Sequence, residues 1–419
     1  MHAIIETGGK QYKVAEGDAR RICPSMVNTR LRHPASTGRP HLAPILRTSR
    51  GSLSTGFISV LNRTIMAFLR SSRAFKTTGL GMHWDTEDPF IFVSHHEDDY
   101  PRGNRQQAPP LNEISGRNLG RDYQLRLGYR MYHGKVVPGF PMHAHWGYET
   151  LTVPEKGYID HFDTERIEGR FGFGDAQWVS ASSKYEHCEM YPLANQEDRN
   201  PNDITQIMIN LPLEMKNKGN QVSTVWKEDV SAVHGNGWDA EVFCGDFGGA
   251  SAESPNAVSY AKRSNGVRII RFALSPGSTV PIDAAADGAS RNLYFISGKD
   301  AEILGEKVGF YNRLKFSHMG GFDIRNGEEP SVMWLLEGRP IKQRMSSFGP
   351  VTLGDLKEVR KGMDEIRRNE FLEWPWDIID KAQPLGTERF IRYPDGTEIR
   401  PDGKRGDDKG MEGETLRFE

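Results

Sequence analysis

The sequence predicts a mostly β protein whose strands form sandwiches or barrels. The chain has 419 residues, of which 44 are glycine and 24 are proline, and this density of turn formers favours many short strands over long helices. Short apolar runs, several of them alternating between apolar and polar residues, are separated by Gly, Pro, Asn and Asp. Many short strands with turn signals between them are typical of β-sandwiches and barrels.

The composition excludes several classes of protein. Hydrophobic residues make up 37% of the chain, enough for a sizeable core, and the net charge of −2 argues against a protein that binds nucleic acid directly. The three cysteines, Cys23, Cys188 and Cys244, are too scattered for a disulfide framework or a cysteine-rich zinc site. No uninterrupted apolar run approaches the roughly 18 residues of a membrane helix, so no membrane association is expected.

The N-terminal region differs from the rest of the chain. Residues 1–18 resemble the start of a bacterial-type large-subunit ribosomal protein, with two strands flanking Gly8 and Gly9. Chains shorter than about 40 residues rarely fold alone, so we interpret this fragment as a chimeric N-terminus without ribosomal function. Residues 19–81 contain ten arginines and one lysine but no acidic residue, which predicts a disordered basic leader.

The leader also decides the expected location of the protein. Arginine-rich, serine-rich segments without acids are typical of organelle transit peptides. If the leader is a transit peptide, the protein is organellar. If the leader is an artefact of a misjoined N-terminus, the protein is cytoplasmic or nuclear.

The body contains two blocks of predicted strands. The first block, 82–225, contains apolar runs at 89–93, 123–127, 148–153 and 204–211. A Gly-, Asn- and Ser-rich connection, 226–265, leads to the second block, 266–350, with runs at 267–274, 291–297 and 331–336. In the remaining segment, 351–419, apolar residues at helical spacing predict a helix over 353–370, and Asp395-Gly396 predicts a hairpin in the charged tail.

Two pairs of metal-binding residue types occur in the first block: His143 with His145, and His187 with Glu189. Residues i and i+2 of a strand point to the same face, about 6.6–6.8 Å apart along the chain. Two adjacent strands can therefore direct three imidazoles and one carboxylate at a single point, a donor set that suits Fe(II), Mn, Ni, Cu or Zn. The competing interpretation is that these are ordinary core histidines, since the chain has 13 of them.

These residues stand in a specific set of motifs, which extends over roughly 82–375. The sequence resembles the pirin family of bicupins in the segments Phe140-Pro-Met-His143-Ala-His145-Trp-Gly-Tyr-Glu-Thr150, Gly174-Asp-Ala-Gln-Trp178, His187-Cys-Glu-Met190, Leu336-Glu-Gly-Arg-Pro340 and Phe348-Gly-Pro350. The resemblance implies two consecutive cupin (jelly-roll) barrels. It also implies that the first barrel holds one divalent transition metal, Fe(II) in the first place, through His143, His145, His187 and Glu189.

The resemblance implies two alternative functions. One is a quercetin 2,3-dioxygenase-like oxidoreductase that acts on a small aromatic substrate such as a flavonol, with Glu189 as the catalytic general base. The other is a non-enzymatic, iron-dependent transcription co-regulator whose partner is a transcription-related protein. In either case we expect a monomer.

Other candidate residues receive lesser roles. The second block contains His318 but no paired ligands, so its barrel is expected to be metal-free.

Strand parity places Glu149 and Gly147 on the face of His145, and we expect Glu149 to contact the ligands without binding the metal. We expect His95-His96-Glu97-Asp98-Asp99 to be a loop at the barrel rim. Trp146 and the segment 182–186 depart from the family pattern and leave the shape of the pocket open.

Overall fold

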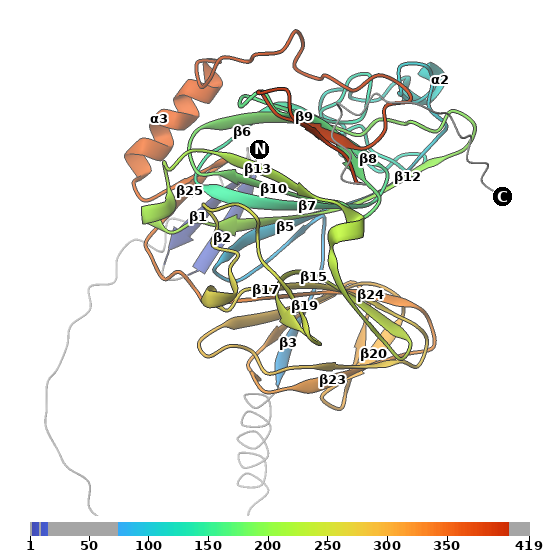
Figure 1. The fold of residues 1–419 in the computed structure, drawn as a ribbon, viewed down its shortest axis with the longest axis vertical. Coiled ribbons are helices and arrows are strands. Elements are labelled where there is room, and N and C mark those ends of the chain that lie inside the picture. Colours follow the sequence, from blue (N-terminus) through green and yellow to red (C-terminus); the bar gives the residue numbers. More distant parts are fainter. Residues whose placement is uncertain (1, 8–9, 16–73, 402–419) are drawn as a thin grey trace, which may run out of the picture. The chain divides into compact units, whose positions relative to one another are not determined.

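The structure is a computed structural model and describes residues 2–7, 10–15 and 74–401 (Figure 1). The chain divides into two units, Met1–Ala74 and Phe75–Glu419. In the first unit, β1 (His2–Thr7) and β2 (Lys10–Ala15) pair antiparallel, as expected for the strands flanking Gly8 and Gly9. The remainder of the predicted leader up to residue 73 lies outside the described residues, and the origin of the fragment stays a prediction.

The first barrel of the second unit consists of two antiparallel sheets of six strands each. The strand order in one sheet is β13 (Gln221–Val225), β10 (Ala176–Ala181), β7 (Tyr148–Lys156), β12 (Asn200–Asn210), β5 (Phe90–Tyr100) and β4 (His83–Trp84). The order in the other sheet is β28 (Glu398–Ile399), β27 (Phe390–Arg392), β9 (Glu168–Gly172), β8 (Tyr158–Asp163), β11 (Tyr185–Met190) and β6 (Gly139–His145).

The second barrel contains an eight-stranded and a four-stranded sheet. The larger sheet has the order β14 (Ser231–Gly235), β15 (Trp238–Phe247), β17 (Arg268–Leu274), β24 (Ser331–Gly338), β19 (Ser290–Ser297), β22 (Asn312–Phe316) and β3 (Phe75–Gly79), with β16 (Ala250–Ala252) paired to β15. The smaller sheet has the order β18 (Thr279–Ile282), β23 (Phe322–Asn326), β20 (Asp300–Ile303) and β21 (Glu306–Gly309).

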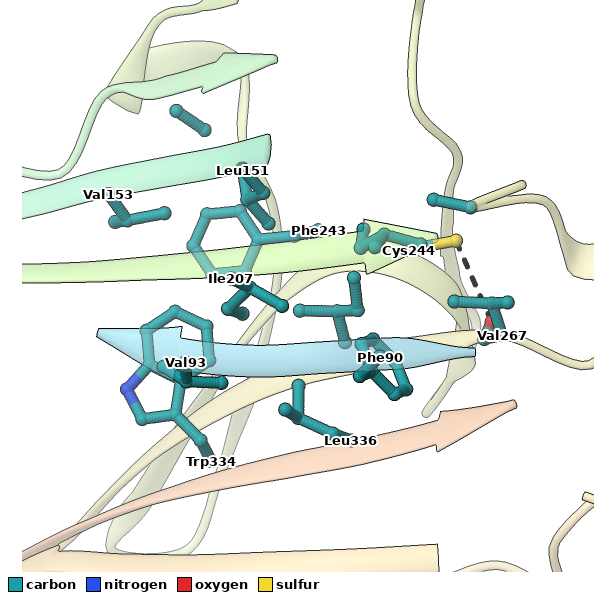
Figure 2. Packing of buried hydrophobic residues seen from close by; sticks show 14 of the residues in the cluster. Phe90, Val93, Leu151, Val153, Ile207, Phe243, Cys244, Val267, Trp334 and Leu336 are labelled. Carbon is teal, nitrogen blue, oxygen red and sulfur yellow. Dashed lines mark hydrogen bonds between the residues drawn. The ribbon is translucent and has the colours of Figure 1, made fainter. Parts of the chain in front are cut away.

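One continuous hydrophobic cluster joins the two barrels (Figure 2). It combines side chains of β5, β7 and β12 with those of β15, β17 and β24, and the buried residues Val93, Ile207, Phe243, Trp334 and Leu336 belong to it. The strand faces that meet here are apolar on both sides, so burying them against each other removes a large apolar area from water. The mostly β, two-barrel fold predicted from the sequence is therefore confirmed.

Helices contribute little to the fold. Helix α3 (Leu356–Arg367) begins after Asp355, whose side chain accepts a hydrogen bond from the Lys357 amide. It is shorter than the predicted 353–370, because residue 353 belongs to β26 (Val351–Leu353), which pairs with β25 (Ser346–Phe348). The remaining helical segments are α2 (Leu111–Ile114), η3 (Leu213–Met215), η4 (Lys227–Asp229) and η5 (Arg263–Asn265). None of the helices in the described part is long and apolar enough to cross a membrane.

Three expected boundaries differ from the structure. Strand β3 lies within the predicted leader and pairs with β22, although its last four residues are exposed and show no apolar alternation. Strands β14–β16 lie within the predicted connection, and β27 and β28 lie within the predicted charged tail. Strands β3, β14 and β28 lie at the ends of their sheets and are held by backbone pairing, which requires little apolar sequence of their own, whereas β15 lies between β14 and β17 and buries most of its side chains.

Glu149 binds the connection between the barrels through hydrogen bonds. Strand parity predicted a position beside the metal ligands for this residue. The Glu149 carboxylate is fully buried and accepts hydrogen bonds from the hydroxyls of Ser180 (3.1 Å), Ser254 (2.7 Å) and Ser259. The partners of Glu149 in these hydrogen bonds are serines and not the metal ligands, so the expectation that Glu149 contacts the ligands is not supported. The strand breaks at Trp146 and Gly147, between β6 and β7, so parity does not carry over from His145.

This buried carboxylate should make stability depend on pH. Burial raises the pKa of Glu149 to about 7, although the three serine hydroxyls oppose the shift. Because the folded pKa exceeds the ordinary 4.5, the folded state binds more protons between these two values, and its stability should fall as the pH rises from about 4.5 to 7. The change is on the order of 3 kcal/mol.

We expect Glu149→Gln to flatten this part of the stability profile, measured by urea unfolding at several pH values. Glu302→Gln is the matched control, since the Glu302 side chain is 51% exposed on β20. If Glu149→Gln and Glu302→Gln change the slope equally, Glu149 is not the source of the pH dependence.

Candidate metal centre

Three histidines converge inside the first barrel. Their nearest side-chain nitrogens lie within 4.8 Å of one another, and His187 Nε2 lies 2.9 Å from His145 Nε2 and 3.1 Å from His143 Nε2. For a metal about 2.1 Å from each nitrogen, ligands at right angles would be roughly 3 Å apart. The distances from His187 Nε2 to the other two nitrogens therefore fit adjacent positions around one octahedral ion.

Backbone register produces this convergence. Strand β11 pairs antiparallel with β6, and His187 lies directly opposite His143. Directly opposed residues in an antiparallel pair share a face of the sheet. His145 lies two residues from His143 on β6 and so points to the same side.

The histidines are held as neutral imidazoles, the form that binds metals. His143 Nδ1 lies 3.0 Å from the Pro141 carbonyl oxygen, which can only accept, so Nδ1 carries the proton and Nε2 presents its lone pair. His145 Nδ1 is hydrogen-bonded to the Tyr148 hydroxyl. Burial lowers the pKa of His145 and His187 well below the ordinary value, and the neighbouring imidazoles lower it further.

Glu189 lies beside the histidines but farther from them. Its Oε2 is 3.6 Å from His187 Nε2 and 3.8 Å from His143 Nε2. The pairing of β11 with β6 is irregular between His187 and Glu189, so the second pair does not repeat the simple alternation assumed from the sequence. Burial raises the pKa of Glu189, and a hydrogen bond from Gln206 partly opposes this shift.

Gln206 is a residue of the site that sequence reasoning missed. Its Nε2 lies 3.1 Å from both carboxylate oxygens of Glu189 and 3.0 Å from Thr152 Oγ1. Gln206 stands on β12, in the sheet opposite the ligand strands. A polar residue at an inward position within the apolar run 204–211 was the available signal, because such a residue is normally hydrogen-bonded.

A second buried polar group adjoins His187. Asp163 lies opposite His187 on β8, and its Oδ2 accepts a hydrogen bond from the Tyr185 hydroxyl (2.8 Å) and lies 3.1 Å from His161 Nε2. The rings of His161 and His187 are 5.3 Å apart. These three residues, absent from the sequence-based site, fill the side of the barrel behind His187.

The site is most accessible on the side of His143. The His143 side chain is 31% exposed, whereas that of His187 is 1% exposed. The Phe140 ring lies 5.9 Å from the His143 ring and continues into an aromatic cluster with Tyr132 and Tyr191. The partly exposed Phe140 ring provides a surface at the open side on which a planar molecule can stack.

The chain after α3 returns to the first barrel and covers the outer face of the ligand strands (Figure 1). The Met142 amide donates to Ile379 O (2.7 Å), and Trp376 Nε1 donates to Asp163 O (2.8 Å). Cys188, which points away from the ligands as parity predicts, contacts Lys381 O through its sulfur. This segment supports the strands from outside at positions adjacent to the ligands.

Other expected positions differ from the structure. The segment His95–Asp99 is not a loop, because it forms the central part of β5. His95 pairs with Asp203 at 3.1 Å, and the Asp98 carboxylate accepts hydrogen bonds from Arg130 and Tyr132. Gly147 lies in the turn after β6 with φ +90°, and its carbonyl accepts a hydrogen bond from Lys216 Nζ, so it does not continue the strand face of His145 as parity predicted. No second cluster of metal-ligand type occurs in the described residues.

Comparisons with known proteins agree with this architecture. The sequence model of the pirin family matches residues 70–209. A pirin-like protein of Arabidopsis thaliana is 26% identical over 285 residues, which cover 64% of this chain and 88% of the relative. A Pseudomonas aeruginosa protein described as a candidate quercetin 2,3-dioxygenase is 21% identical over 257 residues, covering 56% of this chain and 79% of the relative.

A solved structure confirms the fold over the body of the chain. The quercetin 2,3-dioxygenase from Acinetobacter baumannii superimposes with a TM-score of 0.55 at 16% sequence identity. The match covers 71% of this chain and 95% of the solved one. The fold is thus the bicupin fold, with the histidine cluster in the first barrel.

Proposed function

We propose that this bicupin is a metal-dependent dioxygenase that acts on flavonol-type, quercetin-like substrates. His143, His145, His187 and Glu189 would hold one divalent transition metal, Fe(II) in the first place. The convergence of three imidazoles, with Glu189 at their edge, is the observation that carries the proposal. Relatives described as quercetin 2,3-dioxygenases support the choice of substrate class.

When bound, the metal supplies Lewis acidity for a hydroxyl and a carbonyl oxygen of the substrate, and the redox chemistry that dioxygen requires. The residues of the chain orient the substrate and exclude water. The partly exposed Phe140 ring stacks against the planar substrate on the open side of His143, and the buried rings of Tyr132 and Tyr191 support Phe140 from behind. The buried walls around His187 exclude water from the inner side.

Glu189 is the general base of the proposal. Its pKa is raised by burial, which makes the carboxylate a better acceptor for the hydroxyl proton of the substrate. Gln206 donates to both carboxylate oxygens and holds the group in place while it accepts this proton. Glu189 therefore combines the role of a ligand with that of a proton acceptor.

Metal content tests the first step. We expect the full chain, purified anaerobically and loaded with Fe(II), to retain close to one equivalent of metal by elemental analysis, and His187→Ala to lose it. His234 on β14 forms an exposed pair with Asp239 on β15. His234→Ala is therefore the matched control and should retain the metal. Equal retention by both variants would contradict the site.

Tyr148 should tune the affinity of the site. Its hydroxyl bonds His145 Nδ1 and thereby fixes the orientation of that ring and the nitrogen left for the metal. We expect Tyr148→Phe to weaken Co(II) binding by about 10- to 100-fold and to change its visible absorption. Tyr123→Phe, on an exposed tyrosine, is the control.

Oxygen consumption tests the reaction. We expect the Fe(II)-loaded chain to consume dioxygen when quercetin is added, and His143→Ala and Glu189→Gln to reduce the rate by at least about 100-fold. If the metal binds but uptake equals that of His143→Ala, the dioxygenase proposal fails. That outcome would favour the non-enzymatic alternative, an iron-dependent transcription co-regulator.

A further inference from the structure

A buried histidine outside the proposed ligand set, His161, lies next to the ligand His187. Both residues are fully buried, and their ring centroids are 5.3 Å apart with the planes at 73°. The register between β8 and β11 places Asp163 opposite His187. The same register places His161 opposite Glu189. The inner face of β8 therefore carries an imidazole and a carboxylate beside two of the proposed ligands.

Asp163 fixes the tautomer of His161. Asp163 Oδ2 lies 3.1 Å from His161 Nε2, and a carboxylate oxygen accepts hydrogen bonds. His161 Nε2 therefore carries the ring proton and donates it, and Nδ1 of the neutral ring keeps its lone pair. The carboxylate is itself held in place, because Oδ1 accepts from the Ile167 amide (2.8 Å) and Oδ2 from the Tyr185 hydroxyl (2.8 Å).

The two neighbouring rings carry complementary nitrogens. His187 directs Nε2 at the Nε2 atoms of His143 and His145, so as a metal ligand it carries its proton on Nδ1. Nδ1 of His187 and Nδ1 of His161 are both buried without a hydrogen-bond partner among the described residues. The first is a donor that needs an acceptor, and the second is an acceptor that needs a donor. Buried polar groups are normally paired, so the two nitrogens suit each other.

We propose that Asp163 and His161 position the ligand His187, with His161 Nδ1 accepting the Nδ1 proton of His187 directly or through one bridging water. A hydrogen bond to the outer nitrogen of a ligand imidazole fixes its tautomer and ring orientation and raises its basicity toward the metal. This role rests on the proposed metal site. It determines how tightly that site holds a metal and leaves open which reaction the metal supports.

The proposed hydrogen bond completes a pattern among the ligands. The other two ligand imidazoles already have an outer partner, a backbone carbonyl for His143 and the Tyr148 hydroxyl for His145. His161 is not a ligand in this arrangement, since its nitrogens do not belong to the group that converges within 4.8 Å. It is instead the partner that His187 requires on its outer side.

Co(II) binding to the full chain tests the proposal with a matched pair of variants at His161. Asparagine places a carboxamide oxygen close to the position of Nδ1, whereas leucine has a similar shape without an acceptor. We expect His161→Leu to weaken Co(II) binding by about 10- to 100-fold and to change the visible absorption of the bound ion. His161→Asn should restore most of the affinity.

Asp163→Asn provides an independent test with an almost unchanged shape. The Ile167 amide holds the carboxamide oxygen, so the NH2 group faces His161 Nε2 and donates to it. The ring proton of His161 then moves to Nδ1, where it opposes the Nδ1 proton of His187. Asp163→Asn should therefore weaken Co(II) binding by about 10- to 100-fold, as His161→Leu does.

Proton NMR of the Co(II)-loaded chain separates positioning from a general loss of stability. Bound Co(II) shifts the N–H protons of its ligand imidazoles out of the crowded region of the spectrum, and a buried hydrogen bond slows their exchange with water. One of these signals should exchange faster in His161→Leu than in the parent chain and stay slow in His161→Asn. Weaker binding with unchanged exchange would indicate a loosened fold and would overturn the assignment.

The same measurements distinguish this role from the metal site on which it rests. If the parent chain binds Co(II) and both His161→Leu and Asp163→Asn bind it equally tightly, the positioning role is wrong and the metal site stands. If the parent chain does not bind Co(II), the metal site is wrong and the positioning role fails with it.

Discussion

The candidate metal centre depends on the backbone pairing of β6 with β11. This ladder places His143 directly opposite His187, and the alternation within β6 then brings His145 to the same side. A shift of one residue in this register would turn the ligands of one strand to the outer face of the sheet. The cluster of three imidazoles follows from this register, whereas Glu189 lies beyond an irregularity in the same pairing.

The register is protected from both sides of the sheet. On the inner side, Glu189, Gln206 and Thr152 form hydrogen bonds that connect the ligand sheet with the opposite one. On the outer side, the chain after α3 binds the backbone at Met142 and Asp163, next to ligand positions. Polar groups inside a barrel are costly unless paired, so these contacts stabilise the site as well as orient it.

The second barrel supports the first without a metal cluster of its own among the described residues. Its contribution is the shared hydrophobic cluster, in which Phe243 and Trp334 pack against the strands that carry Leu151 and Ile207. Ser254 and Ser259 of the connection donate hydrogen bonds to the buried carboxylate of Glu149 on β7 of the first barrel. The two barrels therefore share one core, although only the first carries a candidate centre.

The sequence by itself determined the β-rich fold class and the pairing of His143 with His145 on one strand face, because apolar alternation and i, i+2 spacing are local properties of strands. That His187 joins them was implied by the family resemblance. It could not place Glu149, since a turn at Trp146 and Gly147 interrupts the alternation on which parity depends. It also missed Gln206 and the segment that binds Met142 and Asp163. These contacts join residues far apart in the chain, and only the tertiary structure decides which of many polar side chains meet. Edge strands such as β3 were missed for the same reason, because they are held by hydrogen bonds to a distant strand instead of by their own apolar pattern.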